Sequence, residues 1–186
     1  MVLPQVANDS STPQRTQCLP CRAPEVWQGY PCQHAADIWS LGVSVRCPPP
    51  NTCPGGEKKL TQQQLTTAAS PHRLFGHDDK IVQGHTEAWC IAKMIRLVGP
   101  PGPPVNPLYK EEFERAKDLA NMYRLGGRTR MIDRRDWRTE LESVADPPVP
   151  SDLLDFIASL LVMDPDKRPV AEDALLHPYL KNSIQR

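Results

Sequence analysis

The sequence RAPEVWQGYPCQHAADIWSLGV, residues 22–43, decides how the rest of the chain can fold. It contains a short turn-forming segment, a loop with Gly29 and Pro31, and an apolar helix that starts at about residue 34. Apolar residues surround most of this helix, and a helix that is hydrophobic on nearly all sides belongs in a protein interior. Asp37 lies within it, so we expect a buried carboxylate that is held by backbone N–H groups or by a cation.

The segment after this helix breaks the pattern. Three consecutive prolines, residues 48–50, predict that the helix ends by about Arg46, because proline removes a helical N–H and restricts the residue before it. Residues 46–73 show neither helical nor strand periodicity. We interpret them as a low-complexity insertion, and both a translated intron and a natural loop insertion account for this composition.

Four amphipathic helices are predicted in the second half of the chain. Apolar residues there recur at i, i+3, i+4 and i+7, the spacing of one helical face. Thr86 and Ser151 are expected to cap two of them, and Gly126-Gly127 to end another. The expected ranges are 86–98, 109–123, 151–161 and 170–176.

Several short motifs occur in an order that is typical of one enzyme family. They are Ala23-Pro24-Glu25, Asp37-Ile38-Trp39-Ser40-Leu41-Gly42, Asp164-Pro165-Asp166-Lys167-Arg168-Pro169 and His177-Pro178-Tyr179-Leu180. In this order they resemble the second half of the large lobe of eukaryotic protein kinases. The stretch from Leu97 to Pro101 further resembles the group of the SR-protein-specific kinases and its fungal-type members. The resemblance covers residues 17–43 and 74–180.

This resemblance implies a mainly α fold: the helical C-lobe part of the protein kinase-like fold, truncated and without the N-lobe sheet. It divides the chain into five segments. They are a disordered lead (1–16), a docking segment with the buried helix (17–45), the insertion (46–73), the remaining C-lobe helices (74–180) and a tail (181–186).

The resemblance also implies roles for individual residues. It places Leu19, Pro20, Cys21 and Arg22 in the strip that docks the protein substrate, with Cys21 where the family usually has Tyr. It gives structural roles to Glu25, Asp37, Trp39 and Arg168.

Glu25 and Arg168 are expected to form a buried ion pair that ties the docking segment to the C-terminal helices. A solvated acid at a helix start is the alternative for Glu25. Val170 stands where the family commonly has a capping Ser or Thr.

The chemistry of this family needs four further motifs. These are a Gly-rich loop, a strand lysine, His-Arg-Asp with Asn five residues on, and Asp-Phe-Gly for magnesium. In the family all four precede Ala-Pro-Glu, and none occurs in these 186 residues. Arg134-Arg135-Asp136 and Leu74-Phe75-Gly76 mimic two of them but lie after it.

We therefore expect no catalytic residue and no cofactor in this chain, although ATP and magnesium serve the complete family domain. The parent activity implied is phosphorylation of protein Ser or Thr. The alternative is a non-catalytic interaction module that binds a kinase substrate or partner. In a complete kinase the catalytic loop covers the helix around Asp37. Without it we expect Asp37 to lack donors and nearby apolar residues to lack partner surface: Ile38, Trp39, Leu41 and Val43.

Composition limits the partners. The 22 basic and 22 acidic residues give a formal charge of zero, so the chain lacks the basic excess that nucleic-acid binding requires. No membrane span and no signal peptide are expected, which indicates an intracellular protein, cytoplasmic or nuclear. The Cys18-Leu19-Pro20-Cys21 stretch fits ordinary thiols, half of a zinc site or a redox couple, so a small zinc-binding regulator is a third possibility.

Overall fold

The computed structural model describes residues 15–45, 74–144 and 148–184, and the insertion at 46–73 and most of the lead lie outside this part. Helices dominate the described residues, which confirms the mainly α class. Their one isolated β-bridge joins Tyr123 to Arg130. The elements are η1 (Leu19–Cys21), α1 (Pro24–Gln28), α2 (His34–Ser44), α5 (Thr86–Leu97), η2 (Pro107–Tyr109), α6 (Lys110–Asn121), α7 (Trp137–Val144), α8 (Ser151–Leu160), η3 (Pro165–Lys167), α9 (Ala171–Leu175) and α10 (Pro178–Ile184).

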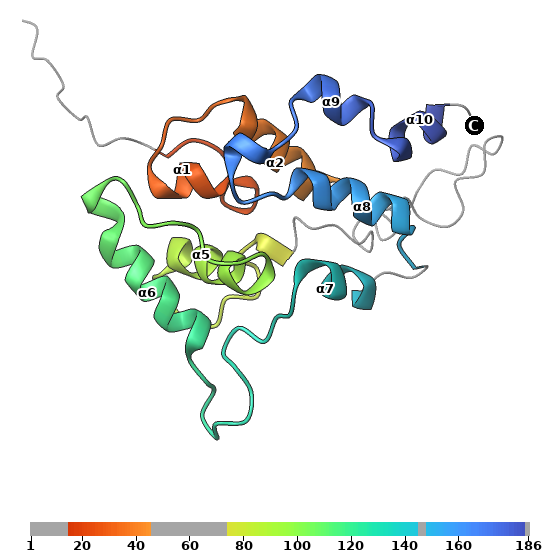
Figure 1. The fold of residues 1–186 in the computed structure, drawn as a ribbon. Helices are drawn as coiled ribbons and strands as arrows, with labels where there is room; N and C mark the ends of the chain where they lie inside the picture. Colours follow the sequence, from red (N-terminus) through yellow and green to blue (C-terminus); the bar gives the residue numbers. More distant parts are fainter. Residues whose placement is uncertain (1–14, 46–73, 145–147, 185–186) are drawn as a thin grey trace, which may run out of the picture.

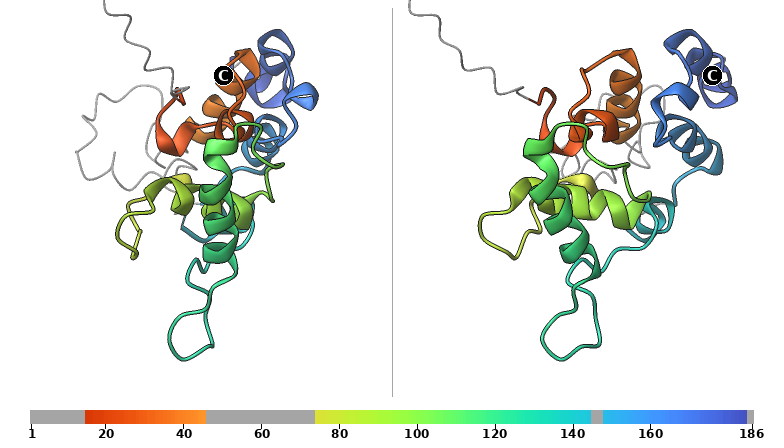
Figure 2. Two further views of the ribbon diagram at one scale, coloured as in Figure 1. Left: turned by 90° about the vertical axis from the view of Figure 1, so that its left-hand side faces the viewer. Right: turned by 60° about the vertical axis from the view of Figure 1, so that its left-hand side comes forward.

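The helices form two groups that share one apolar core. In Figure 1, α1, α2, α8, α9 and α10 occupy the upper part, and α5, α6 and α7 lie below them. The views of Figure 2 show the same division after rotation. Helix α8 packs along α2, and α6 packs along α5. An early and a late part of the described chain are therefore in contact, because α2 comes early in the sequence and α8 late.

The central helix α2 is buried on part of its circumference only. Trp39 and Val43 are fully buried, and Trp39 packs edge-on against Phe75 with 5.9 Å between ring centroids. Asp37 and Leu41, however, are exposed, so the expectation of a buried carboxylate was wrong. Among the described residues, α8, η1 and η3 pack against α2, and the side chains of Asp37 and Leu41 remain exposed beside them. The expected loss of cover holds for Leu41 and fails for Ile38, Trp39 and Val43, which are buried.

A glycine sets the distance between α2 and α8. A Cβ added at Gly42 would lie 2.9 Å from Leu160 Cβ and 2.9 Å from Leu161 Cδ2. Any side chain there would push the two helices apart. The small residue in the motif therefore has a packing reason.

The predicted helices in the second half are present, but their ends differ. Thr86 is the first residue of α5, and its hydroxyl donates to the Gly84 carbonyl instead of capping the helix. Pro150, not Ser151, holds the N-cap position of α8. Helix α6 ends at Asn121 instead of continuing to the glycine pair, because the chain turns there into the Tyr123–Arg130 bridge.

Three short helices were not predicted: α1, α7 and α10. Asp136 starts α7 by accepting bonds from the Thr139 amide (3.1 Å) and hydroxyl (2.6 Å). The Arg134-Arg135-Asp136 sequence is thus a helix start. Helices of this length hold too few apolar residues to show a period.

Candidate functional site

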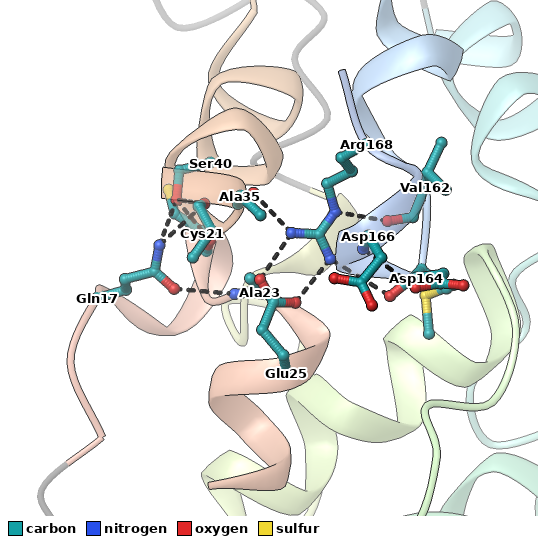
Figure 3. A network of polar contacts seen from close by, with 12 residues as sticks. Gln17, Cys21, Ala23, Glu25, Ala35, Ser40, Val162, Asp164, Asp166 and Arg168 are labelled. Carbon is teal, nitrogen blue, oxygen red and sulfur yellow. Dashed lines mark hydrogen bonds and ion pairs between the residues drawn. The ribbon is translucent and has the colours of Figure 1, made fainter. Parts of the chain in front are cut away.

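The most elaborate polar site in the described residues is centred on Arg168, which follows η3. Its guanidinium forms a bidentate pair with Glu25 of α1, with 2.7 Å from Nη1 to Oε1 and 2.6 Å from Nη2 to Oε2. Both residues are 6% exposed. Figure 3 shows the two side chains between the elements they join. The pairing expected from the sequence is present, and the solvated alternative for Glu25 is excluded.

Backbone carbonyls take the remaining donors of Arg168. Nε donates to Val162 O (2.7 Å), Nη1 also to Ala35 O (2.6 Å) and Nη2 also to Met163 O (3.3 Å). A guanidinium has five N–H donors, so all of them are used. The plane also lies 5.4 Å from the Trp39 ring centroid. One side chain therefore holds α1, the start of α2 and the turn after α8 together.

A second polar cluster attaches η1 to α2, and its centre is Gln17 (Figure 3). Gln17 Oε1 accepts from the Ala23 amide at 3.0 Å, and Nε2 donates to Ser40 Oγ at 2.8 Å. Ser40 Oγ in turn donates to Cys21 O at 2.9 Å. Gln17 has a φ of 68°, which is uncommon for a residue other than glycine. This arrangement fixes the strip that the resemblance assigns to substrate docking.

That strip is only partly accessible. Leu19, Pro20 and Cys21 are half-buried on η1, and Arg22 is buried. The guanidinium of Arg22 lies 4.3 Å from the Trp27 ring centroid, and its Nη1 lies 3.4 Å from a Glu87 carboxylate oxygen. Arg22 thus ties the strip to α1 and α5. Leu19 and Pro20 offer the part that a partner could reach.

Cys18 and Cys21 are free cysteines, with no disulfide bond between them. Burial, together with a hydrogen bond between the neutral Cys21 thiol and Cys18, raises the pKa of Cys21 to about 11. A redox couple needs a nucleophile with a lowered pKa, so Cys21 is a poor candidate for one. Among the residues that the structure places, no group of three or more His, Cys, Asp or Glu side chains could hold a metal ion.

A buried lysine network on α5 was not predicted from the sequence. Lys93 of α5 is fully buried and donates to Gly76 O (2.7 Å) and to Asp79 (2.8 Å). Asp79 also accepts from Arg134 at 2.7 Å. Burial lowers the pKa of Lys93, although the Asp79 carboxylate opposes this shift. A lysine between Ala92 and Met94, on an apolar face, was the available signal.

Burial acts on Asp79 to raise its pKa, but the bonds from Lys93 and Arg134 together outweigh it and hold the pKa below the usual range. The network joins the 76–79 turn to α5 and to the segment before α7. These bonds hold the three segments together.

Three hollows border these elements. One, of about 420 Å³, lies beside the ion pair and is lined by Glu25, Asp164 and Asp166 among others. A second, of about 470 Å³, lies between α5 and α6 with Glu87, Glu111, Glu112 and Arg115 on its wall. The third, of about 330 Å³, lies beside Tyr30, and its wall includes Arg15. Each is a place where the described residues could receive a ligand.

No helix in the described part of the chain has the length and apolar character needed to cross a membrane. A scan against models of known protein families gives no match. A comparison with curated proteins finds no match either.

Proposed function

We propose that the chain is the later part of the large lobe of a protein-kinase-like domain, whose parent activity is ATP-dependent phosphorylation of protein Ser or Thr. The buried Glu25–Arg168 pair carries this proposal. It joins the Ala-Pro-Glu motif to the Asp164–Pro169 motif across 143 residues of sequence. The resemblance implies contact between these two side chains, and the bidentate geometry supports it.

The packing of α2 gives further support. The Asp37–Gly42 motif lies in α2. Its Trp39 is fully buried, and the Arg168 guanidinium lies 5.4 Å from the centroid of the Trp39 ring. The three motifs thus converge on one site. Independent short motifs would have no reason to meet in this way.

We further propose that residues 1–186 position a substrate or partner and do not transfer phosphate by themselves. The sequence contains none of the four motifs that hold nucleotide and magnesium in this family. Purified chain with Mg·ATP and a Ser-rich protein substrate should therefore give no labelled product. Magnesium-dependent transfer that is lost on mutation within residues 1–186 would overturn this assignment.

The second candidate is a non-catalytic interaction module that binds a protein through η1. It is favoured by the position of Leu19 and Pro20, which keep accessible surface on a strip fixed from behind by Gln17. A photo-crosslinker on the exposed Cys18 thiol tests it. A specific protein that crosslinks to the wild-type chain and no longer crosslinks to Leu19→Asp supports docking on η1. The same crosslinked proteins with Leu19→Asp as with the wild type refute docking on η1.

The control for this experiment is Leu125→Asp. Leu125 is fully exposed in the turn after α6 and lies in a different part of the chain. Its substitution should leave the adduct unchanged.

A further inference from the structure

Arg15 lies in an environment unusual for an arginine at the edge of a domain. Its side chain is only 5% exposed. The guanidinium lies 3.6 Å from the centroid of the Tyr109 ring and 5.1 Å from that of Trp27. Two aromatic rings therefore hold the cation by cation–π contact in a fixed place.

Its hydrogen bonding is one-sided. Nη1 donates to Glu112 at 2.6 Å and lies 3.7 Å from a Glu87 carboxylate oxygen, whereas Nε and Nη2 are buried and have no hydrogen-bond partner among the described residues. A guanidinium presents its donors as a planar fork that matches the two oxygens of a carboxylate or phosphate. Buried donors without an acceptor are unfavourable, so an acceptor that reaches Nε and Nη2 would be stabilising.

The hollow beside Arg15 has the matching character. Its volume of about 330 Å³ is at the small end of ligand pockets. Arg15 is the one charged residue among those that line it, and Thr16 and Tyr30 supply hydroxyl groups. Pro31 and Tyr109 add apolar surface. No acidic residue of the described chain lines it, in contrast to the two hollows described above, although Glu112 and Glu87 pair with Nη1 of Arg15 from behind the wall.

We propose that this hollow binds an oxyanion, phosphate or carboxylate, carried on a short aromatic or apolar stem. The Nε and Nη2 donors of Arg15 hold two oxygens of the anion, and the hydroxyl groups of Thr16 and Tyr30 complete its coordination. The stem packs against Pro31 and the tyrosine rings. This site uses neither the docking strip nor the Glu25–Arg168 pair, so it does not depend on the proposed function.

The probes are phenyl phosphate, benzoate and inorganic phosphate, added to the full chain labelled with ¹⁵N. The readout is the arginine Nε–H resonance of Arg15, assigned by its loss in Arg15→Lys. We expect a saturable shift with phenyl phosphate or benzoate and a weaker response to inorganic phosphate. Tighter binding of phenyl phosphate assigns the site to phosphate esters, and tighter binding of benzoate assigns it to carboxylates. No saturable response to either organic anion up to roughly 10 mM would overturn the proposal.

Two variants test the geometry by calorimetry. Arg15→Lys keeps the positive charge but loses the planar fork of donors. We expect its affinity for the organic anion to fall by about tenfold or more. Cys32→Trp fills the hollow from an exposed position without changing Arg15, and we expect it to abolish binding.

The matched control is Arg115→Lys, because Arg115 is exposed and lines a different hollow. Its affinity for the organic anion should equal that of the wild type. Unchanged binding in Arg15→Lys and Cys32→Trp would refute the site, as would an equal loss in Arg115→Lys. Where Arg15→Lys fails to fold, Cys32→Trp decides.

Discussion

Replacing Arg168 by methionine removes the side chain that joins three segments. The change leaves the Glu25 carboxylate without its counter-ion, although this residue is only 6% exposed. It also leaves the carbonyl groups that Arg168 binds without a hydrogen-bond donor. Breaking a buried pair by removing one partner costs about 3–5 kcal/mol. Each stranded carbonyl adds up to about 1–3 kcal/mol unless water reaches it. Domains of this size are stable by only about 5–15 kcal/mol, so Arg168→Met is expected to lose most of its free energy of unfolding.

A double-mutant cycle isolates the pair. Urea unfolding, followed by fluorescence of the buried Trp27 and Trp39, is measured for Arg168→Met, Glu25→Gln and the double variant. The double variant should lose less than the sum of the single losses, by about 0.5–3 kcal/mol. Arg168→Lys serves as the charge control, and it should remain destabilised because an ammonium cannot supply five planar donors. Additive single losses would refute the coupling.

The remaining predictions concern packing, capping and pH. Gly42→Ala should destabilise the chain by about 1–3 kcal/mol by forcing α2 from Leu160, whereas Ser44→Ala at the exposed helix end should have little effect; equal melting temperatures would contradict this. Val170→Ser should stabilise by about 1 kcal/mol, because Val170 is the N-cap of α9 in an extended conformation without a side-chain cap bond, and a thermal melt no higher than that of Val170→Ala would count against it. The pKa of Asp79 is lowered in the folded chain, so its contribution to the free energy of unfolding is complete above its ordinary pKa of 3.8 and is lost as the pH falls through the folded value. The stability of Asp79→Asn should therefore lack this loss in acid, and a dependence on acid pH equal to that of the wild type would exclude the mechanism.

The sequence predicted the parts of this fold that depend on periodicity and on motif order. The long helices α5, α6 and α8 carry enough apolar residues to define a face, and each lies where its pattern indicated. The Glu25–Arg168 contact followed from two motifs considered together. Neither residue alone distinguishes a buried pair from a solvated charge.

The parts that were missed depend on three-dimensional placement. Thr86 does not cap α5 because it is the first helical residue, after the N-cap position, and its hydroxyl oxygen accepts from Lys80 Nζ at 2.6 Å instead of from a helix amide. Asp37 is exposed because the neighbours of α2 cover only some of its sides, which no helical wheel reveals. Nothing in the sequence distinguishes Gln17 or Arg15 from other polar residues. The role of Gln17 depends on its positive φ, and that of Arg15 on two aromatic rings that folding brings together.

The central claim, that this chain is the later part of a kinase-like large lobe, is tested most directly by sequencing the mature transcript through and upstream of these codons. If this assignment is right, an in-frame coding sequence upstream of Met1 encodes a Gly-rich loop, a strand lysine, His-Arg-Asp and Asp-Phe-Gly, in that order. On the same assignment, residues 46–73 are an insertion between Val45 and Leu74 that interrupts the resemblance. A mature transcript whose upstream sequence encodes none of those four motifs would contradict the assignment.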